Sequence, residues 1–317
     1  MKLLVTGGAG YIGAHVVLAA QAAGHQTTVI DDLSTGQPSR LDDSTELIEL
    51  NLAAPDAEAK LTRLFRQRFD AVIHLAARKQ VGESVAKPEE YYRDNIGGLA
   101  NLLLAMRATN HDALVFSSSA ATYGMPDVDQ VSEDDTPKPI NPYGETKLIG
   151  EWMVKNAKVW GLRGVSLRYF NVAGTGAPGL ADSAALNLIP IAIGQLRRGE
   201  KPKVFGADYP TEDGSCIRDY IHVSDLAAAH VAAVDYLFAD HQKHDVFNVG
   251  TGTGASVLEV LAELQRVSGI EFEPEVAPRR AGDPPKLVAN AHLIERVLGF
   301  RARHDLADIV DSAWNLK

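Results

Sequence analysis

Near its N-terminus the chain reads Val5-Thr6-Gly7-Gly8-Ala9-Gly10-Tyr11-Ile12-Gly13, between a short apolar run and an alanine-rich stretch with helical spacing. The glycines fit the pattern G-x-G-x-x-G through Gly8, Gly10 and Gly13, and a wider G-x-x-G-x-x-G pattern that starts at Gly7. Positions without a side chain permit a tight turn and a close approach of the backbone to a pyrophosphate, which the helix N-terminus attracts. Because strand, loop and helix follow in this order, the stretch predicts a dinucleotide-binding unit and not an ordinary strand–helix turn.

Short apolar runs and helical patterns alternate along the first half of the chain. The runs typical of strands are residues 2–6, 27–31, 46–50, 71–76, 113–117 and 165–170. The stretches with helical spacing are residues 12–23, 56–67, 91–108 and 143–160. Strands and helices that alternate in this way form βαβ units. We therefore predict an α/β fold, a doubly wound parallel Rossmann sheet with helices on both faces.

The chain changes character after residue 170. Gly, Pro and Asp residues interrupt 174–183, 206–214 and 278–285, with helical patterns at 188–198 and 257–269 and a strand pattern at 245–250. Irregular loops above a rigid sheet are where binding residues concentrate. We expect residues 1–170 to form the nucleotide-binding domain. Residues 171–317 would then form a smaller, loop-rich α/β lobe for the substrate, with segments that return to the first domain.

The composition excludes several classes of protein. Of 317 residues, 45% are hydrophobic and 23% are charged, which is enough apolar material for a core and argues against disordered and fibrous proteins. The net charge of −10 and the absence of any lysine or arginine run argue against a nucleic-acid partner. No stretch has the length and apolar character of a signal-peptide core or a membrane span, so we expect no membrane association.

Cysteine use and metal-ligand spacing are equally simple. The single cysteine, Cys216, cannot form an intrachain disulfide, which fits a reducing compartment, and we expect a cytoplasmic protein. No grouping of His, Cys, Asp and Glu in the sequence has the spacing of a structural metal site. We therefore predict no metal centre.

The second predicted strand ends in two acidic residues. Asp31 lies 21 residues after Gly10, at the position from which a carboxylate binds the adenosine ribose of a dinucleotide. Asp32 adds a second negative charge, and no lysine or arginine lies between Gly13 and Pro38 to compensate the charge of a 2′-phosphate. The sequence therefore favours NAD over NADP as the cofactor.

A tyrosine and a lysine lie in the first turns of the predicted helix after the serine-rich strand. Tyr143 and Lys147 are four residues apart, so their side chains share one helical face. The ordinary pKa of a phenol, about 10, is too high for a base at neutral pH, and a nearby ammonium together with a positive nicotinamide ring lowers that pKa. Such a pair is otherwise an ordinary surface contact. The strand that precedes it leads us to predict Tyr143 as the base and Lys147 as its partner.

That strand ends in hydroxyl groups, in the stretch Ser117-Ser118-Ser119-Ala120-Ala121-Thr122. Its carboxyl end lies at the sheet edge where open α/β folds bind their ligands. One of these hydroxyls can hydrogen-bond the same substrate hydroxyl as Tyr143. We predict Ser119 for this role, with Ser118 and Thr122 as alternatives.

Together these motifs resemble the extended short-chain dehydrogenase/reductase family, through the Thr6–Gly13 loop, the serine strand and the Tyr143-x-x-x-Lys147 pair. Within that family the chain is most similar to the UDP-glucose 4-epimerase (UDP-galactose 4-epimerase) subfamily. The further stretches that carry this similarity are Val81–Ser84, Glu90–Tyr92, Arg168–Asn171, Asp208–Gly214, Arg218–Val223 and Ala277–Asp283. The resemblance covers nearly the whole chain.

For the cofactor, NAD, the resemblance implies contacts from loops at the strand ends. Lys79 would reach the cofactor phosphates and Lys147 its ribose, while Asn95 would bond the backbone and help to hold the Ser119 strand edge. Asn51 stands where the family usually has an acidic adenine contact. The implied cofactor-binding residues are Gly7, Gly10, Tyr11, Ile12, Gly13, Asp31, Asp32, Asn51, Leu52, Ala76, Lys79, Asn95, Tyr143, Lys147 and Phe170.

For the substrate, the resemblance implies a UDP-sugar. Arg218 and Arg280 resemble a clamp for its diphosphate, because a planar guanidinium matches phosphate oxygens, and Asp283 resembles a ribose contact. The other implied substrate contacts are Asn171, Asn187, Leu188, Tyr220, Ser119 and Tyr143. A surface salt bridge for each arginine and a turn cap for each asparagine are the alternative roles.

The implied reaction is the reversible C4 epimerisation of a UDP-hexose, UDP-glucose or UDP-galactose, by an NAD-dependent isomerase through a transient 4-keto sugar. Leu287 stands where the family often has a bulky aromatic, which leaves UDP-N-acetylhexosamines open as substrates; UDP-pentoses and UDP-uronic acids stay open too. Ala120-Ala121 stand where related nucleotide-sugar 4,6-dehydratases have Asp-Glu, which argues against that activity. A non-catalytic NAD-binding scaffold has no need of Tyr143 and Lys147 together.

Two predicted helices are apolar around more of their circumference than one buried face requires. Trp152, Met153 and Trp160, within residues 148–160, cannot all point toward one sheet. Together with residues 100–108, they lead us to predict a homodimer that forms through these two helices, in line with the family.

Overall fold

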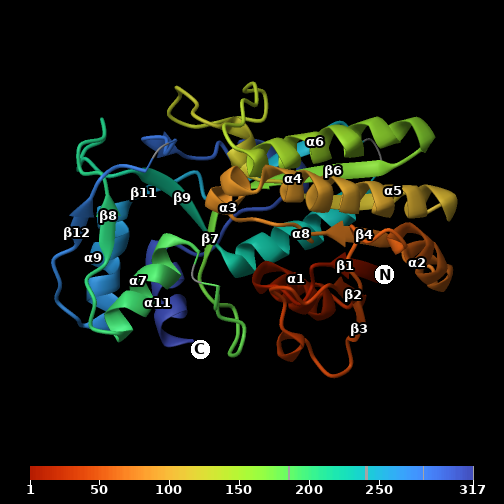
Figure 1. Ribbon diagram of the computed structural model, residues 1–317, viewed down its shortest axis with the longest axis horizontal. Helices are drawn as coiled ribbons and strands as arrows, with labels where there is room; N and C mark the ends of the chain where they lie inside the picture. The colour runs from red at the N-terminus through yellow and green to blue at the C-terminus, as the bar shows by residue number, and fades with distance from the viewer. Residues whose placement is uncertain (185, 240–241, 281, 317) are drawn as a thin grey trace.

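A seven-stranded parallel sheet forms the core of the larger part of the molecule (Figure 1). The computed structural model describes residues 1–184, 186–239, 242–280 and 282–316. Across the sheet the strands run in the order β3 (Glu46–Glu49), β2 (Gln26–Asp31), β1 (Lys2–Thr6), β4 (Ala71–His74), β5 (Ala113–Ser117), β6 (Arg163–Tyr169) and β10 (Val246–Val249). The strand order reverses between β1 and β4, which is the doubly wound arrangement. The predicted fold class is confirmed.

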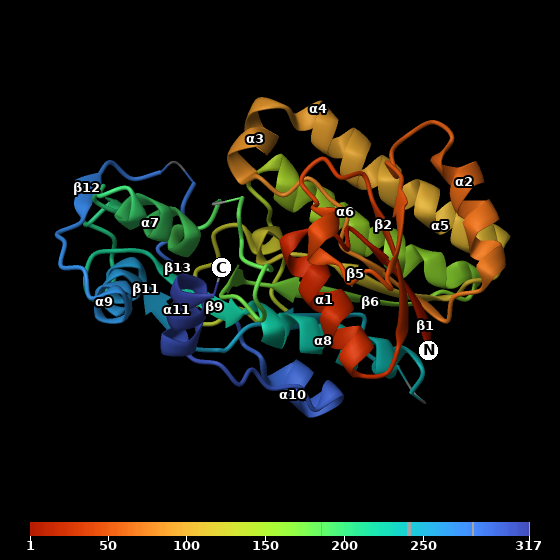
Figure 2. The same cartoon turned by 90° about the horizontal axis from the view of Figure 1, so that it is seen from below.

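Helices cover both faces of this sheet (Figure 2). On one face pack α1 (Tyr11–Ala22), α8 (Val223–Leu237) and α10 (His292–Leu298); on the other pack α2 (Ala57–Leu64), α5 (Gly98–Ala108) and α6 (Pro142–Asn156). The alternation of side chains along a strand decides which residue faces which layer. In β1, Leu3 and Val5 pack in the α1/α8 layer and Leu4 packs in the α5 layer, all of them fully buried.

The long helical patterns of the sequence are broken in the structure. Residues 91–108, predicted as one helix, form α4 (Pro88–Tyr91), a wide π-helical segment (Tyr92–Gly97) and α5. Residues 143–160 form α6 and then a 3-10 turn (Ala157–Trp160) that ends at Gly161 with a φ of +96°. The other short helical segments are α3 (Val81–Ala86) and 3-10 turns at Pro38–Arg40, Phe65–Gln67 and Ala120–Tyr123.

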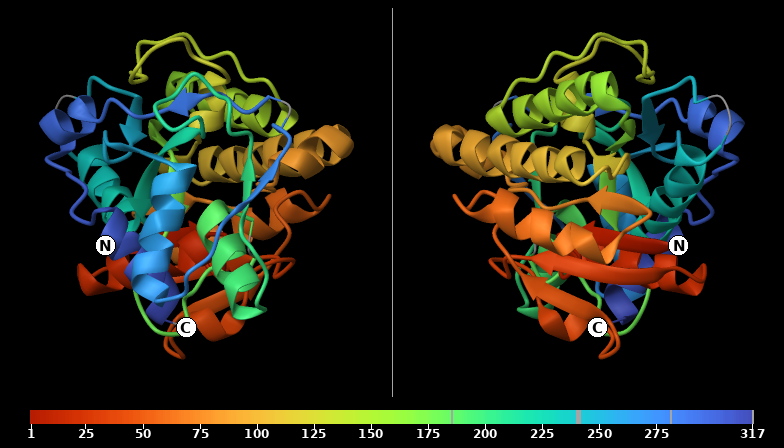
Figure 3. Two further views of the ribbon diagram at one scale, coloured as in Figure 1. Left: turned by 90° about the vertical axis from the view of Figure 1, so that its left-hand side faces the viewer. Right: turned by 90° about the vertical axis from the view of Figure 1, so that its right-hand side faces the viewer.

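A smaller lobe lies beyond the carboxyl ends of the sheet strands (Figures 1 and 3). Its main sheet joins β7 (Asn171–Ala173), β9 (Ile217–His222), β11 (Gly254–Ser256) and β13 (Lys286–Leu287), and a second sheet pairs β8 (Lys203–Phe205) with β12 (Glu275–Ala277). Three helices, α7 (Leu188–Arg197), α9 (Val257–Ser268) and α11 (Leu306–Asn315), pack around its core. The predicted loop-rich α/β lobe is thus present.

Two segments from the second half of the chain join the first sheet. Strand β10 pairs with β6, and α8 packs against α1 and the sheet through a row of buried side chains. The sequence pattern predicts β10 but does not predict α8. This helix begins with an unusual cap, in which the His222 ring accepts the Ser224 N–H, in place of the Ser, Thr, Asp or Asn that normally marks a helix start. The division at residue 170 stays a prediction.

No helix in the described ranges is long and apolar enough to span a membrane.

Candidate active site

The glycine loop joins β1 to α1 through backbone contacts that leave no room for side chains. Gly7 has a φ of +74°, and a Cβ added there would lie 2.7 Å from the backbone nitrogen of Ala76, just after β4. A Cβ at Gly13 would lie 2.0 Å from the Gly7 carbonyl oxygen. The loop is therefore a tight cradle at the N-terminus of α1, the geometry that suits a pyrophosphate.

Asp31 ends β2 beside this loop. Its Oδ2 accepts a hydrogen bond from the Ala9 N–H (3.0 Å), and its Oδ1 accepts one from the Leu33 N–H (2.9 Å). Burial raises the pKa of the Asp31 carboxyl, and these two hydrogen bonds oppose that rise. The carboxylate is thereby fixed at the strand end where the sequence predicts the ribose contact.

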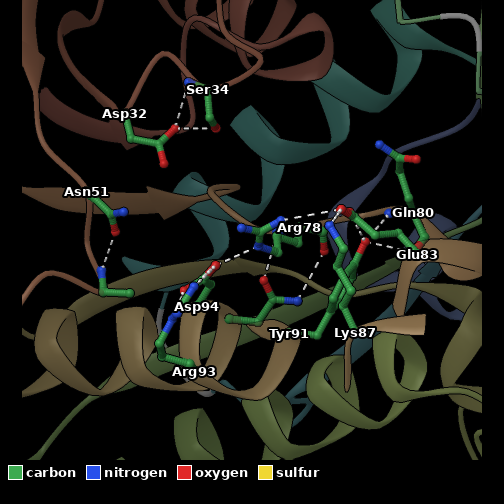
Figure 4. Close-up of polar contacts among 12 residues, drawn as sticks. Asp32, Ser34, Asn51, Arg78, Gln80, Glu83, Lys87, Tyr91, Arg93 and Asp94 are labelled. Atoms are coloured by element: carbon green, nitrogen blue, oxygen red, sulfur yellow. Dashed lines mark hydrogen bonds and ion pairs between the residues drawn. The ribbon is translucent and has the colours of Figure 1, made fainter. Parts of the chain in front are cut away.

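A cavity of about 280 Å³ opens beside the same strand end. Its wall includes Asp32 and Asn51, which follow β2 and β3 (Figure 4). Asp32 accepts hydrogen bonds from the Ser34 N–H (3.0 Å) and hydroxyl (2.6 Å), and Asn51 accepts one from the Ala53 N–H (2.8 Å). The structure thus brings two predicted adenosine contacts together in one hollow.

The first basic residue after Asp31 and Asp32 in the sequence, Arg40, is hydrogen-bonded to oxygen atoms of the protein. Arg40 is buried, and its guanidinium donates to the Ala181 carbonyl (3.1 Å) and the Ser183 hydroxyl (2.9 Å). These bonds tie the loop after β2 to a loop of the second lobe. Arg40 therefore does not weaken the preference for NAD that the acidic strand end indicates.

Several predicted cofactor residues are held inside the protein. The Tyr11 hydroxyl donates to the carbonyl oxygen of Gly174 (2.6 Å), and burial raises its pKa. Ile12 is partly buried in the α1/α8 layer, Leu52 packs in the α5 layer, and Phe170 packs in a small cluster below the strand ends. Because the Tyr11 side chain is committed to Gly174, its backbone is the part that can contribute to the cradle.

The loop after β4 carries the exposed Lys79 and is held from below by Asn95. Asn95 Oδ1 accepts the Arg78 N–H (2.7 Å), and its Nδ2 donates to the Arg78 carbonyl (3.1 Å) and to the Thr146 hydroxyl on α6 (3.0 Å). The resemblance implied that Asn95 helps to hold the Ser119 strand edge. The hydrogen bonds of Asn95 run instead to the Lys79 loop and to α6, because the π-helical segment turns this side chain toward the Arg78 backbone.

Tyr143 and Lys147 are both buried at the start of α6, which begins where Asn141 caps it. Lys147 Nζ donates to the Ser117 carbonyl (2.8 Å) and lies 5.9 Å from the centre of the Tyr143 ring. Burial lowers the pKa of Lys147 to about 8. Burial also raises the pKa of Tyr143, and a hydrogen bond with Ser119 opposes that rise. Burial therefore dominates the pKa of this phenol.

Of the candidate hydroxyls, the structure brings Ser119 to the tyrosine. The Ser119 hydroxyl lies close enough to Tyr143 to lower the pKa of the phenol, and it accepts the Ala121 N–H of the following 3-10 turn (3.2 Å). Thr122 donates its hydroxyl back to the Ser119 carbonyl (2.8 Å), and Ser118 points to α6. The alternatives Ser118 and Thr122 are therefore committed to other partners.

Ser117 and Ser118 form side-chain hydrogen bonds that the sequence does not predict. The Ser117 hydroxyl pairs with Nε2 of His230 on α8 (2.7 Å), and the Ser118 hydroxyl donates to Glu151 on α6 (2.5 Å). Glu151 lies four residues after Lys147 on the same helical face. From this spacing, the sequence alone could have predicted that Glu151 lies beside Lys147.

The predicted substrate residues of the second lobe line one cavity of about 240 Å³. They are Asn171, Asn187, Leu188, Arg218, Tyr220, Arg280 and Asp283. Arg218 donates to Asp283 (3.2 Å), the Arg280 guanidinium lies 3.8 Å from the centre of the Phe205 ring, and the buried, free Cys216 also lines the wall. Within the described ranges, no group of three or more His, Cys, Asp or Glu is arranged to hold a metal ion.

Comparison with known families adds to this geometry. The model of the NAD dependent epimerase/dehydratase family matches residues 3–250. The chain belongs to this family. Its membership confirms the resemblance seen in the sequence and the predicted nicotinamide cofactor.

Individual relatives match over nearly the whole chain. The UDP-glucose 4-epimerase of Corynebacterium glutamicum is 45% identical, with 99% of this chain and 95% of that protein covered. The solved UDP-glucose 4-epimerase from Brucella ovis in complex with NAD has a TM-score of 0.93 and 41% identity, with coverage of 99% and 97%. The one from Stenotrophomonas maltophila, with bound NAD and formylated UDP-arabinopyranose, has a TM-score of 0.93 and 37% identity at the same coverage.

The glycine cradle gives a direct test of cofactor binding. Gly13→Ala should reduce the NAD retained by the purified protein about tenfold, because its Cβ would displace the Gly7 carbonyl and open the cradle. The NAD released on denaturation, per mole of protein, measures the change. Gly97→Ala is the matched control, since a Cβ there meets nothing within 4 Å. Equal NAD content in the two variants would contradict the assignment.

Proposed function

We propose that this protein catalyses the NAD-dependent, reversible C4 epimerisation of a UDP-hexose, with UDP-glucose and UDP-galactose as substrates. The observation that carries the proposal is the position of Tyr143, Lys147 and Ser119. Ser119 follows the carboxyl end of β5, and at that same strand end Lys147 donates to the Ser117 carbonyl and lies beside the Tyr143 ring. Relatives named for this activity match the chain over nearly its whole length.

The residues present fit a dinucleotide. Side chains on Gly7 and Gly13 would fill the cradle, Asp31 stands fixed beside it, and the hollow with Asp32 and Asn51 extends from the same edge. Lys79 is exposed on the neighbouring loop, where it can meet a phosphate. When bound, NAD would accept the hydride from C4, return it to the opposite face, and add a positive charge beside the phenol.

The side chains at the strand end supply the proton chemistry. Tyr143 as phenolate removes the proton of the 4-hydroxyl, and Ser119 orients that hydroxyl. A buried phenol resists ionisation, so the proposal requires cationic charge near it, of which the Lys147 ammonium is one part. When the 4-keto sugar has turned over in the pocket and its C4 is reduced on the other face, Tyr143 returns the proton to the C4 oxygen.

The cavity of the second lobe fits a strong hold on the nucleotide and a weak hold on the sugar. Arg218 and Arg280 provide two guanidinium groups for a diphosphate, and Asp283 lies beside Arg218 for a ribose hydroxyl. A sugar that must present both faces of C4 to the same nicotinamide ring cannot be held rigidly. Charged contacts are therefore expected at the diphosphate and not around the hexose.

A second candidate substrate is a UDP-N-acetylhexosamine, and one observation favours it. Leu287 on β13 packs against a cluster that contains Ala120, Tyr123 and Phe170, next to Ser119. A leucine is smaller than an aromatic residue and leaves more room for a 2-acetamido group. Parallel assays with UDP-galactose and UDP-N-acetylgalactosamine decide between the two substrates.

We propose also that two copies of the chain pair through α5 and α6. These helices lie on the same face of the sheet (Figures 1 and 2). Leu104 is 47% exposed, Trp152 53% and Val159, in the turn after α6, 89%. Met153 and Trp160, in contrast, pack partly against the core.

We place the protein in the cytoplasm, in keeping with its free, buried cysteine and its nucleotide ligands.

The proposed reaction predicts a clear effect of the base. Wild-type protein given UDP-galactose without added NAD should yield UDP-glucose with no net NADH, as followed by ¹H NMR and absorbance at 340 nm. Tyr143→Phe should lower kcat about 10³-fold, since it removes the proton acceptor and leaves the ring in place. Unchanged circular dichroism serves as the control. Near-normal turnover by the variant would refute the role of Tyr143, and a 4-keto-6-deoxy product would indicate a dehydratase.

The proposed dimer predicts a specific sensitivity to charge. Trp152→Arg should convert the dimer to a monomer at micromolar concentration, because a charge in the middle of an apolar interface is costly. Light scattering coupled to gel filtration measures the mass. Val276→Arg, at a site 63% exposed on the second lobe, is the control and should leave the dimer intact. A monomeric wild-type protein would contradict the proposal.

A further inference from the structure

Helix α6 carries three chemically active side chains on successive turns of one face. Tyr143 and Lys147 belong to the proposed site, and Glu151 follows one turn later, buried like the other two. Glu151 touches neither the glycine cradle nor the cavity of the second lobe. Its Oε1 accepts the Ser118 hydroxyl (2.5 Å), and Ser118 lies between Ser117 and Ser119.

A buried ion pair fixes Glu151 from the other side. Arg168, on β6, donates from Nε to Oε1 (2.8 Å) and from Nη2 to Oε2 (2.7 Å), and both side chains are only 5% exposed. The Arg168 guanidinium also lies 4.7 Å from the centre of the Tyr123 ring, in the turn after Ser119. The two parallel hydrogen bonds fix the orientation of the Glu151 carboxylate relative to Arg168. Removal of either partner would leave a buried charge without compensation and would destabilise the fold.

The strand end held by this pair is the one on which the site is built. The Ser117 carbonyl accepts the Lys147 ammonium (2.8 Å), and the Ser118 N–H donates to the Leu167 carbonyl on β6 (2.8 Å). The next residue is Ser119, the partner of Tyr143. A shift of Ser118 would therefore move both the acceptor of the lysine and the hydroxyl that orients the substrate.

We propose that Glu151 is a positioning residue of the active site, which acts through Ser118 and Arg168 to hold the Ser117–Ser119 strand end against α6. This inference rests on the proposed function, since it concerns the same Tyr143, Lys147 and Ser119. It adds a fourth side chain that contacts neither cofactor nor substrate. Its effect should appear in kcat and not in the KM for the UDP-sugar, because the Arg218/Arg280 cavity is remote from it in the fold.

The charge of Glu151 gives it a second effect, on Lys147. Tyr143 on α6 and His74 on β4 lie near Lys147, and Arg168 on β6, with Tyr123 and Glu133 near it, pairs with Glu151. Tyr169 on β6 lies near Tyr143, and His230 on α8 pairs with Ser117 from the other face of the sheet. The pKa of His74 is lowered to about 3 and that of Tyr123 is raised to about 12, so both are neutral at pH 7. Burial lowers the pKa of Lys147 to about 8, and the negative charge of Glu151 opposes that fall.

Two variants separate the hydrogen bond from the charge. Glu151→Gln removes the charge but keeps an oxygen that can accept from Ser118, and Ser118→Ala removes the hydroxyl but keeps the ion pair. Each should lower kcat for UDP-galactose about tenfold with KM within about twofold of wild type. Asp112→Asn, which breaks the Asp112–Arg163 ion pair at the opposite end of the same two strands, is the matched control and should keep wild-type kcat.

The Lys147 titration gives a readout that needs no turnover. In NAD-loaded protein with ¹³C-labelled lysine, the Lys147 signal is the one missing from Lys147→Arg. Its midpoint should fall by about one pH unit in Glu151→Gln, which leaves Arg168 uncompensated, and should not move in Ser118→Ala. The ammonium form is the one present below the midpoint, so the high-pH limb of kcat should shift to lower pH in Glu151→Gln alone.

The outcomes distinguish the inference from the proposed function. Wild-type kcat in both variants, with the Lys147 midpoint unmoved and only the melting temperature lowered, would overturn the positioning role. Ser118→Ala keeps the test decisive if Glu151→Gln fails to fold. A wild-type protein that converts no UDP-sugar would overturn the proposed function, and the lysine titration would still decide the effect of the Glu151 charge.

Discussion

The whole site depends on one constraint, that every strand of a parallel sheet ends at the same edge. The carboxyl ends of β1, β2, β4, β5 and β6 deliver the glycine loop, Asp31, Ala76, the serine run and Phe170 within reach of one another. Reversal of the strand order between β1 and β4 opens the crevice there. The second lobe, entered directly from β6 through β7, lies beyond this edge, and Arg218 and Arg280 line its cavity.

Charge is distributed locally in a way that the net value does not reveal. The chain carries −10 overall, yet both of its proposed ligands contain phosphate. In the proposed complex, the cradle would meet one phosphate group with backbone N–H groups and a helix N-terminus, and Arg218 and Arg280 would meet the other with guanidinium groups. In the same proposal, Asp31 and Asp32 stand where ribose hydroxyls would need acceptors and where a 2′-phosphate would be repelled.

The sequence predicts the features that depend on local chemistry. The glycine spacing, the acidic end of β2 and the Tyr143/Lys147 pair are each contained within a few residues, and their physical reasons can be read directly. The sequence could not predict the partners of Asn95, because a π-helical segment rotates that side chain toward Arg78. The sequence does not predict helix α8, because a histidine caps it in place of the usual capping residues. It does not predict the Glu151–Arg168 ion pair, because this pair joins a helix to a strand that packs beside it only in the fold.

In the proposed cycle, the hydrogen taken from C4 goes back to C4 of the same sugar. The most direct measurement uses UDP-[4-²H]galactose, with NMR of the recovered UDP-sugars after equilibrium is reached. The proposed cycle predicts full retention of deuterium at C4 in both UDP-galactose and UDP-glucose, with no NADH accumulated. Deuterium lost to solvent, or found at C6 of a deoxy sugar, would contradict it.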